Sequence, residues 1–231
     1  MKLCRDEGVF TSLQGEGPQA GVPMTFVRLA GCNLRCAWCD TKYSWEGSEE
    51  VDVGQLTNRV VHEVTTSVCI TGGEPLLQAD GVGVLVRQLR MHRRCVAIET
   101  NGSLYPPSWW KEVVWDVDYK CPSAQLDRYV FHDSWRTIGR HNRVKFVVAD
   151  ERDLAFVLDK LPRFIGPLQP TLVVSPVLTA GKDFADGEVY KSVGMFLSQT
   201  WLRRVWQFCV DNDLRFSLQL HKVVFGNRKG V

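Results

Sequence analysis

The stretch GCNLRCAWCD, residues 31–40, follows directly on the apolar run Thr25–Leu29 and spaces three cysteines as C-x3-C-x2-C. A cubane iron–sulfur cluster needs four ligands, usually thiolates, and a loop this short can wrap three of its corners. With three thiolates the fourth iron has no protein ligand, and an open position is typical of a catalytic metal site. We therefore predict that Cys32, Cys36 and Cys39 hold a [4Fe–4S] cluster with one open iron.

Two other kinds of site also use clustered cysteines. A structural zinc ion needs a fourth ligand, and His62 and His92 lie far off in the sequence, in helical surroundings. A redox pair of the thioredoxin kind would use Cys36 and Cys39 alone and would leave Cys32 without a role. The spacing therefore favours the cluster.

Strand patterns and helix patterns alternate around this loop and along most of the chain. Strands are expected over residues 25–29, 67–71, 95–99, 113–117, 144–148, 172–175 and 216–220, and helices over 55–64, 82–89, 151–161 and 197–211. Such alternation argues for parallel βαβ units with right-handed crossovers. With about seven units at most, the predicted fold is an α/β, partial (incomplete) TIM-like barrel. We expect a single domain over residues 1–231.

The polar motifs follow successive strands of this predicted sheet. Residues 31–33, 72–75 and 100–102 each come directly after a strand, Lys120 closely follows the fourth, and His221 ends the last. Because function gathers at the carboxyl ends of parallel strands, we expect these residues to meet at one rim.

Composition excludes several other classes of protein. Hydrophobic residues make up 45% of the 231, enough for a sizeable core, and the net charge of +2 gives no reason to expect nucleic acid as a partner. No apolar stretch is long enough for a membrane span, and the charged start, residues 1–10, does not resemble a signal peptide. We expect a cytoplasmic protein with no membrane contact, where clustered cysteines bind metal or carry out chemistry.

The cysteine spacing resembles the signature of the radical S-adenosylmethionine (SAM) superfamily. In that superfamily SAM chelates the open iron, and one electron from the cluster cleaves it to give a 5′-deoxyadenosyl radical. The next strand ends in TGGEP, residues 71–75, which resembles the superfamily element that binds the SAM amino group. Paired glycines let a backbone approach a ligand closely, and Glu74 can accept from an ammonium group. The segment 99–102 either bonds the ribose or shapes the turn, and the sequence leaves both open.

Further motifs narrow the resemblance. SLQGEG at 12–17, FVR at 26–28, DTKYSW at 40–45 and QLHK at 219–222 together resemble the 7-carboxy-7-deazaguanine synthase family, from about Phe10 to Lys222. The resemblance implies a lyase that contracts 6-carboxy-5,6,7,8-tetrahydropterin to 7-carboxy-7-deazaguanine with loss of ammonia, toward deazapurines such as queuosine and archaeosine. It further implies that hydrogen leaves C6 and later returns, that SAM is regenerated, and that Mg2+ takes part.

The substrate's chemistry and the resemblance together give the expected site. A pterin edge presents donors and acceptors that suit Gln14, Gly15 and Glu16, and its carboxylate suits the Arg28 guanidinium. The resemblance adds Leu13, Thr71 and His221 on the substrate side and the Thr41 hydroxyl for Mg2+. It implies SAM contacts from Trp38, Cys39, Asp40, Gly73, Glu74, Thr100, Asn101, Asp118, Lys120 and Ser175.

Plainer interpretations and one departure stand beside these expectations. Glu16 also suits a solvated loop, Arg28 an ion pair, Thr41 a turn and His221 a strand end. Many family members have Ser-Pro-Lys where this chain has DYK at 118–120, so the lysine is kept and the serine is replaced by an aspartate.

The expected partners are an electron donor such as flavodoxin or ferredoxin and, because the predicted helices are few and short, a second copy in a homodimer. Three rival functions stay open. An activase that abstracts a glycine hydrogen from a partner protein would share the cluster but would not need pterin-binding residues. A zinc-stabilised interaction module would be colourless, and a redox regulator would carry a cluster without cleaving SAM.

Overall fold

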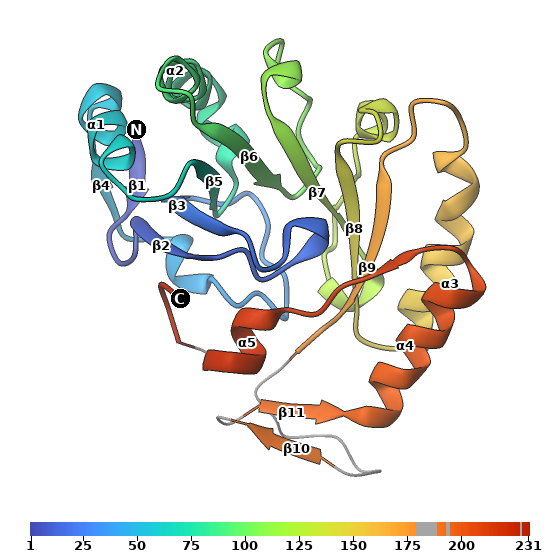
Figure 1. Cartoon of the computed structure of the whole chain (residues 1–231). Coiled ribbons are helices and arrows are strands. Elements are labelled where there is room, and N and C mark those ends of the chain that lie inside the picture. The colour runs from blue at the N-terminus through green and yellow to red at the C-terminus, as the bar shows by residue number, and fades with distance from the viewer. Residues whose placement is uncertain (179–188, 193–194, 227) are drawn as a thin grey trace.

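A partly closed barrel of parallel strands forms the body of the computed structural model, which describes residues 1–178, 189–192, 195–226 and 228–231 (Figure 1). Neighbouring strands in the order β12-β9-β8-β7-β6-β5-β3 all pair in parallel. Their bounds are β3 (Pro23–Leu29), β5 (Ser67–Gly72), β6 (Cys95–Thr100), β7 (Val114–Lys120), β8 (Arg143–Val148), β9 (Thr171–Pro176) and β12 (Arg215–Phe216). The predicted incomplete barrel is therefore confirmed.

Antiparallel strands near the N-terminus extend the sheet beyond β3. They are β1 (Lys2–Cys4), β2 (Val9–Leu13) and β4 (Ser48–Glu50), in the order β3-β1-β4, with β2 paired to β3 along its whole length. A separate hairpin joins β10 (Val189–Ser192) to β11 (Met195–Ser198). None of these five strands was expected from the sequence.

Helices cover the outer side of the curved sheet (Figure 1). They are α1 (Val53–Val61), α2 (Ala79–Met91), α3 (Glu151–Lys160) and α4 (Gln199–Asp211). The short α5 (Leu220–Phe225) lies instead beside the loop after β2, to which Leu220 N is bonded. Side-chain caps fix three of their starts: Asp52, Asp150 and Ser198 each accept from backbone N–H groups of the following turn. Short 3₁₀ turns stand over Gly17–Gln19, Lys42–Ser44, Pro75–Gln78, Trp110–Glu112, Pro122–Ala124, Asp133–Thr137 and Leu161–Phe164. None of the described helices is long and apolar enough to cross a membrane.

The two faces of the strands differ in chemistry. Ile98, Val117 and Phe146 point outward, where they are fully buried in the main hydrophobic cluster. The alternate residues point into the barrel, because side chains along a strand alternate between its faces. On the inner face the strands carry polar groups, among them Asp118 and Lys145, which stand opposite each other in the register of β7 and β8.

A side opening remains between the two ends of the parallel run, and loops close it. The backbone N–H of Gly17, in the loop after β2, donates to Ser217 Oγ at 2.7 Å, and Leu220 N donates to Gly15 O at 2.9 Å. The loop after β2 and the segment after β12 therefore form the missing wall.

This closure corrects the last predicted strand. The other six predicted strands are confirmed to within three residues at each end, but β12 is only Arg215–Phe216, and a helix begins at Leu220. Ser217 N still donates to Val174 O of β9 at 3.0 Å, but the Ser217 hydroxyl and the Leu220 backbone N–H bond to the loop after β2, so the strand does not continue to residue 220. His221 consequently lies in the first turn of α5, not at a strand end.

Candidate active site

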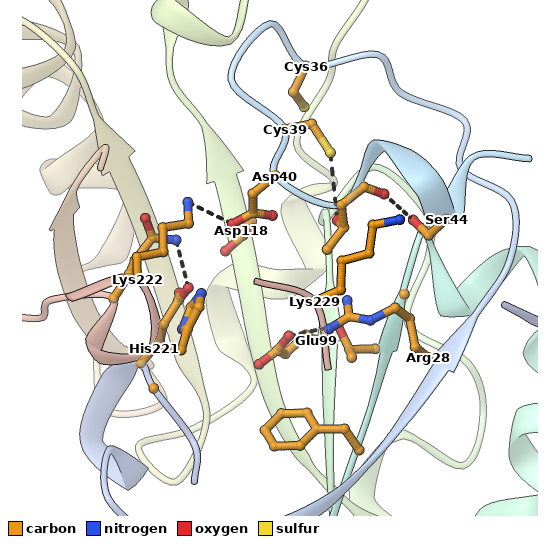
Figure 2. Close-up of a pocket in the computed structure, with 18 of the residues that line it drawn as sticks. Arg28, Cys36, Cys39, Asp40, Ser44, Glu99, Asp118, His221, Lys222 and Lys229 are labelled. Atoms are coloured by element: carbon orange, nitrogen blue, oxygen red, sulfur yellow. Dashed lines mark hydrogen bonds and ion pairs between the residues drawn. The ribbon is translucent and has the colours of Figure 1, made fainter. Parts of the chain in front are cut away.

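The cysteine loop forms one wall of a deep pocket at the carboxyl ends of the strands. Cys32, Cys36 and Cys39 are free thiols that line this pocket, and Cys36 packs with Leu34 and Ala124 in an apolar shell. Burial raises the pKa of the Cys32 and Cys36 thiols, so their thiolate forms depend on a nearby cation. Figure 2 shows Cys36 and Cys39 above the space around which Arg28, Glu99 and His221 are arranged.

These thiols fit a cluster better than a single ion. Among the described residues, no three cysteine, histidine or acidic side chains converge closely enough for one metal ion. A cubane cluster spreads its thiolates over separate iron atoms, so its ligands stand farther apart than those of a single-ion site. Metal binding also supplies the positive charge that deprotonates buried thiols. Three free thiols, one buried and two partly buried, therefore suit an iron–sulfur cluster.

The paired glycines at the end of β5 position this loop. A Cβ on Gly72 would collide with the backbone of Leu29, and one on Gly73 with the backbone of Gly31. Two hydrogen bonds hold the two backbone segments together, from Gly73 N to Leu29 O at 3.0 Å and from Glu74 N to Gly31 O at 2.8 Å. The glycines thus let two backbones meet, and Gly73 also lines the pocket as the sequence predicts.

Glu74 lies outside the pocket lining, so its contact with SAM stays a prediction. Its side chain is fully buried, and its carboxylate accepts from Leu76 N at 2.9 Å, Thr100 Oγ1 at 2.7 Å and Asn101 N at 2.7 Å. Burial raises its pKa despite these donors. Glu74 therefore holds the turn of Thr100 and Asn101, both of which do line the pocket.

Ser175 is the second predicted residue outside the pocket lining. It is fully buried on β9, and its Oγ has no hydrogen-bond partner among the described residues. The pocket is lined near this strand by Val147, its partner in the register, and by Val177. The SAM contact of Ser175 therefore stays a prediction.

The remaining predicted residues meet in this one pocket. They come from the loop after β2, from the inner faces of the strands, from the cysteine loop and from α5: Leu13, Gln14, Gly15, Glu16, Arg28, Cys32, Cys36, Trp38, Cys39, Asp40, Thr41, Thr71, Gly73, Thr100, Asn101, Asp118, Lys120 and His221.

A carboxylate that the sequence analysis left unassigned stands at the centre of the substrate side. Glu99 accepts from Gln14 Nε2 at 3.1 Å and from Thr71 Oγ1 at 2.7 Å. It forms no ion pair within the described residues, so its negative charge faces the pocket. A carboxylate held by two neutral donors is suited to accept further N–H groups from a ligand.

Arg28 provides the opposite charge. Its guanidinium lies 5.4 Å from the centre of the Phe10 ring and 5.7 Å from that of Tyr43. In the part of the chain that the structure describes, its Nε is buried without a partner and no carboxylate pairs with it. An unpaired cation between two aromatic rings is prepared to bind an anion.

Four alternating charges, which we name the charge row, cross the pocket beside these groups. Lys145 contacts Glu16, its Nζ lies 3.2 Å from Asp118 Oδ1, and Lys120 Nζ lies 2.7 Å from Asp118 Oδ2. Burial opposes ionisation at each site, but the opposite charges outweigh it: the pKa values of Glu16 and Asp118 are lowered, and those of Lys120 and Lys145 are raised. All four groups are therefore charged near neutral pH.

Helix α5 is tied to the cysteine loop by a salt bridge. Lys222 Nζ lies 2.7 Å from Asp40 Oδ2. Burial alone would raise the pKa of Asp40, but the Lys222 ammonium group outweighs it and lowers the pKa to about 2. His221, on the same turn, packs so closely on Gly15 that any side chain there would collide with its ring.

Thr41 offers a single oxygen on this side of the pocket. Its Oγ1 lies 3.7 Å from Cys39 Sγ, and its carbonyl accepts from Ser44 Oγ at 2.7 Å. The neighbouring carboxylate, Asp40, is already paired with Lys222. Mg2+ retains water and often takes one protein ligand together with substrate oxygens, so Thr41 suits that manner of binding.

The alternation of charged and apolar residues in β7 and β8 could have indicated further residues inside the barrel. In VWDVDYK at 114–120 and RVKFVV at 143–148, charged residues alternate with apolar ones. In a strand covered by helices on one side, such alternation indicates a polar inner face. It would have placed Asp116, Arg143 and Lys145 inside the barrel.

Asp116 leads to a prediction about pH. Burial raises its pKa to about 6, although the Lys145 and Arg143 cations oppose the shift. The folded protein therefore keeps a proton that the unfolded chain loses above about pH 4, so the free energy of unfolding falls as the pH rises to about 6, by at most about 3 kcal/mol. We expect the melting temperature of the wild type to fall relative to that of Asp116→Asn over this range.

Differential scanning fluorimetry at a series of pH values measures this shift. Asp127→Asn, at an exposed position, is the matched control and should follow the wild type at every pH. Asp116→Asn also loses the contact with Arg143, at 3.6 Å, and this loss shifts its melting temperature by the same amount at every pH. A difference from wild type that does not change with pH would contradict the raised pKa.

Comparisons with known proteins agree with the geometry. The Radical SAM superfamily matches residues 27–114. The chain is 34% identical to the 7-carboxy-7-deazaguanine synthase of Thermoplasma acidophilum, over 96% of this chain and 98% of that protein, and 34% identical to that of Methanospirillum hungatei JF-1, over 94% and 83%. A crystal structure of QueE from Escherichia coli shares the fold, with a TM-score of 0.69 over 95% of this chain and 94% of that one at 21% identity.

Proposed function

The chain belongs to the 7-carboxy-7-deazaguanine synthase family of radical SAM enzymes, and from this membership we propose that it converts 6-carboxy-5,6,7,8-tetrahydropterin into 7-carboxy-7-deazaguanine. The reaction contracts the pterin ring and releases ammonia, and it makes the protein a carbon–nitrogen lyase of deazapurine biosynthesis. The observation that carries the proposal is a pocket in which an unpaired arginine and an unpaired carboxylate lie below a loop of three free thiols.

Charge complementarity supports this substrate. The carboxylate of the pterin pairs with Arg28, whose flanking rings exclude water from the contact. The N–H groups at the other end of the bicycle donate to Glu99, which Gln14 and Thr71 hold in place. A cation and a carboxylate in one pocket restrict the orientations in which a flat, dipolar ring can bind.

The cofactors have their own side of the pocket. Cys32, Cys36 and Cys39 would hold the cluster, and Thr100, Asn101, Asp118 and Lys120 offer the mixed charges and amide that suit the amino-acid part of SAM. When bound, the cluster and SAM supply a carbon radical that takes one hydrogen atom from the pterin. Tyr43 and Trp38 close this side with aromatic surface, and the Lys120 ammonium group lies 5.3 Å from the Trp38 ring centre. The protein thereby keeps solvent away from a reactive intermediate.

Several finer features belong to the same proposal. Mg2+ binds through the Thr41 hydroxyl, with substrate oxygens and water in its other positions. A flavodoxin or ferredoxin supplies the electron, the enzyme works in the cytoplasm as a homodimer, and residues 1–231 act as a single domain. The family membership motivates these features. Metal titration tests the Mg2+ site, reductant substitution the electron donor, and sedimentation the homodimer.

The decisive experiment is anaerobic turnover of the cluster-reconstituted protein with SAM, dithionite, Mg2+ and 6-carboxytetrahydropterin, followed by mass spectrometry. We expect 7-carboxy-7-deazaguanine to form with little net loss of SAM, and no product when the pterin is omitted. Cleavage of SAM without this product would reject the substrate. A protein with a full cluster that neither cleaves SAM nor forms product would reject enzymatic activity of this kind altogether.

A further inference from the structure

The charge row joins two parts of the pocket that lie far apart in the sequence. At one end, Glu16 belongs to the loop after β2, on the substrate side, and its second oxygen accepts from Gln219 Nε2 at 2.8 Å. At the other end, Lys120 lies over the ring of Trp38 in the cysteine loop, and Trp38 Nε1 donates to Ser123 Oγ at 3.0 Å. Lys145 and Asp118 form the middle of the row.

Lys145 is the member that bridges the two sides. Its ammonium group contacts Glu16 and lies 3.2 Å from Asp118, and its side chain is only 8% exposed. Its position is set by the backbone, because Lys145 and Asp118 are register partners on neighbouring parallel strands. Neither the cysteine motif nor the predicted substrate residues include it.

The row is fully paired, and this makes it rigid. Both oxygens of Glu16 and both oxygens of Asp118 have a partner among Gln219, Lys145 and Lys120. Removing one partner of a buried charge network leaves a charge uncompensated, so such a network resists displacement of any single member. A displacement of the Glu16 loop would therefore disturb the pairing of Asp118.

We propose that Lys145 is a positioning residue that fixes the substrate-binding loop at Glu16 relative to the cofactor side at Asp118 and Lys120. The inference rests on the function proposed above. Hydrogen transfer requires the two reacting carbons to be held close together, and a small misplacement far from the chemistry can slow such a step about a hundredfold. Lys145 sets this placement without contacting the reacting atoms.

The test compares Lys145→Met, which keeps an unbranched stem and removes the terminal ammonium group, with Lys145→Arg, which keeps the charge. Two quantities are measured on the cluster-reconstituted enzyme: the ratio of 5′-deoxyadenosine to 7-carboxy-7-deazaguanine, and the Kd of the pterin by anaerobic calorimetry with SAM but without reductant. Lys111→Met, at an exposed position, is the matched control.

For Lys145→Met we expect both the ratio and the Kd to rise about tenfold or more, while iron content and SAM cleavage without pterin stay within about twofold of wild type. In Lys145→Arg the product ratio and the pterin Kd should both be close to those of the wild type. Lys111→Met should match the wild type. Unchanged ratio and Kd in Lys145→Met would overturn the proposal. A parallel loss of iron, SAM cleavage and product in a Lys145→Met protein that is folded by circular dichroism would also overturn it, because that pattern indicates a general structural role.

A second variant covers the case in which Lys145→Met does not fold. Asp118→Asn keeps the shape of the side chain and removes the charge that Lys145 shares with Lys120. The product ratio should again rise about tenfold, and an unchanged ratio would overturn the proposal. If the wild type itself forms no product, the proposed function fails instead, and that result is visible before any variant is made.

Discussion

Cys36→Ala protein is expected to carry no [4Fe–4S] cluster and to form no detectable 7-carboxy-7-deazaguanine, a loss of at least about a thousandfold. Three thiols on one loop leave no spare ligand, since the other cysteines are scattered singly and those of the core lie away from the pocket lining. Iron and sulfide analysis, the absorbance near ~400 nm and anaerobic turnover measure the effect.

Cys95→Ala is the matched control for this experiment. Cys95 is an exposed free cysteine at the start of β6, at the opposite end of the strand from the pocket. Its replacement should leave iron content and turnover within about twofold of wild type. Full iron content with retained turnover in Cys36→Ala would remove Cys36 from the ligand set.

Arg28→Ala should lower pterin turnover by about a hundredfold or more while changing pterin-independent SAM cleavage by less than about threefold. Arg28 is a partly buried cation with a buried Nε and no carboxylate partner among the described residues, and truncating one partner of a desolvated charge pair costs about 2–5 kcal/mol. The cysteine loop does not depend on this guanidinium, so cluster assembly and reductive SAM cleavage should persist.

The conservative variant Arg28→Lys separates charge from geometry. It keeps a cation but loses the planar fork that binds a carboxylate through two parallel bonds, so we expect turnover between those of wild type and Arg28→Ala. Arg87→Ala, on the exposed face of α2, should match the wild type in both assays. An equal loss of pterin turnover and SAM cleavage in Arg28→Ala would place Arg28 outside the substrate site.

Local sequence patterns were sufficient to predict most of the parallel strands and the cysteine loop. A run such as Ser67–Gly72 is apolar and short and ends in glycines, and these are local properties of the chain. The segment 216–220 shows the limit of this approach. It alternates in the manner of a strand, but the Leu220 N–H bonds to Gly15 O and the Ser217 hydroxyl accepts from Gly17 N, some 200 residues away, and no local pattern carries that information.

The site shows a similar limit at the level of single side chains. A motif names Glu74 but does not say toward which side its carboxylate turns, and the structure turns it toward Leu76, Thr100 and Asn101. Lys145 could not be assigned to the site from a sequence motif. It belongs to no motif, and its role follows from the register of two strands, which is a tertiary property.

The wall made by the two distant loops has a consequence for the order of assembly. The three cysteines lie within eight residues of one another directly after β3, so they come together early in synthesis. The Gly17–Ser217 and Glu16–Gln219 bonds span 200 and 203 residues, so they close very long loops and can form only after almost the whole chain has been made. We therefore expect a nascent chain to be able to take up iron well before it can bind pterin.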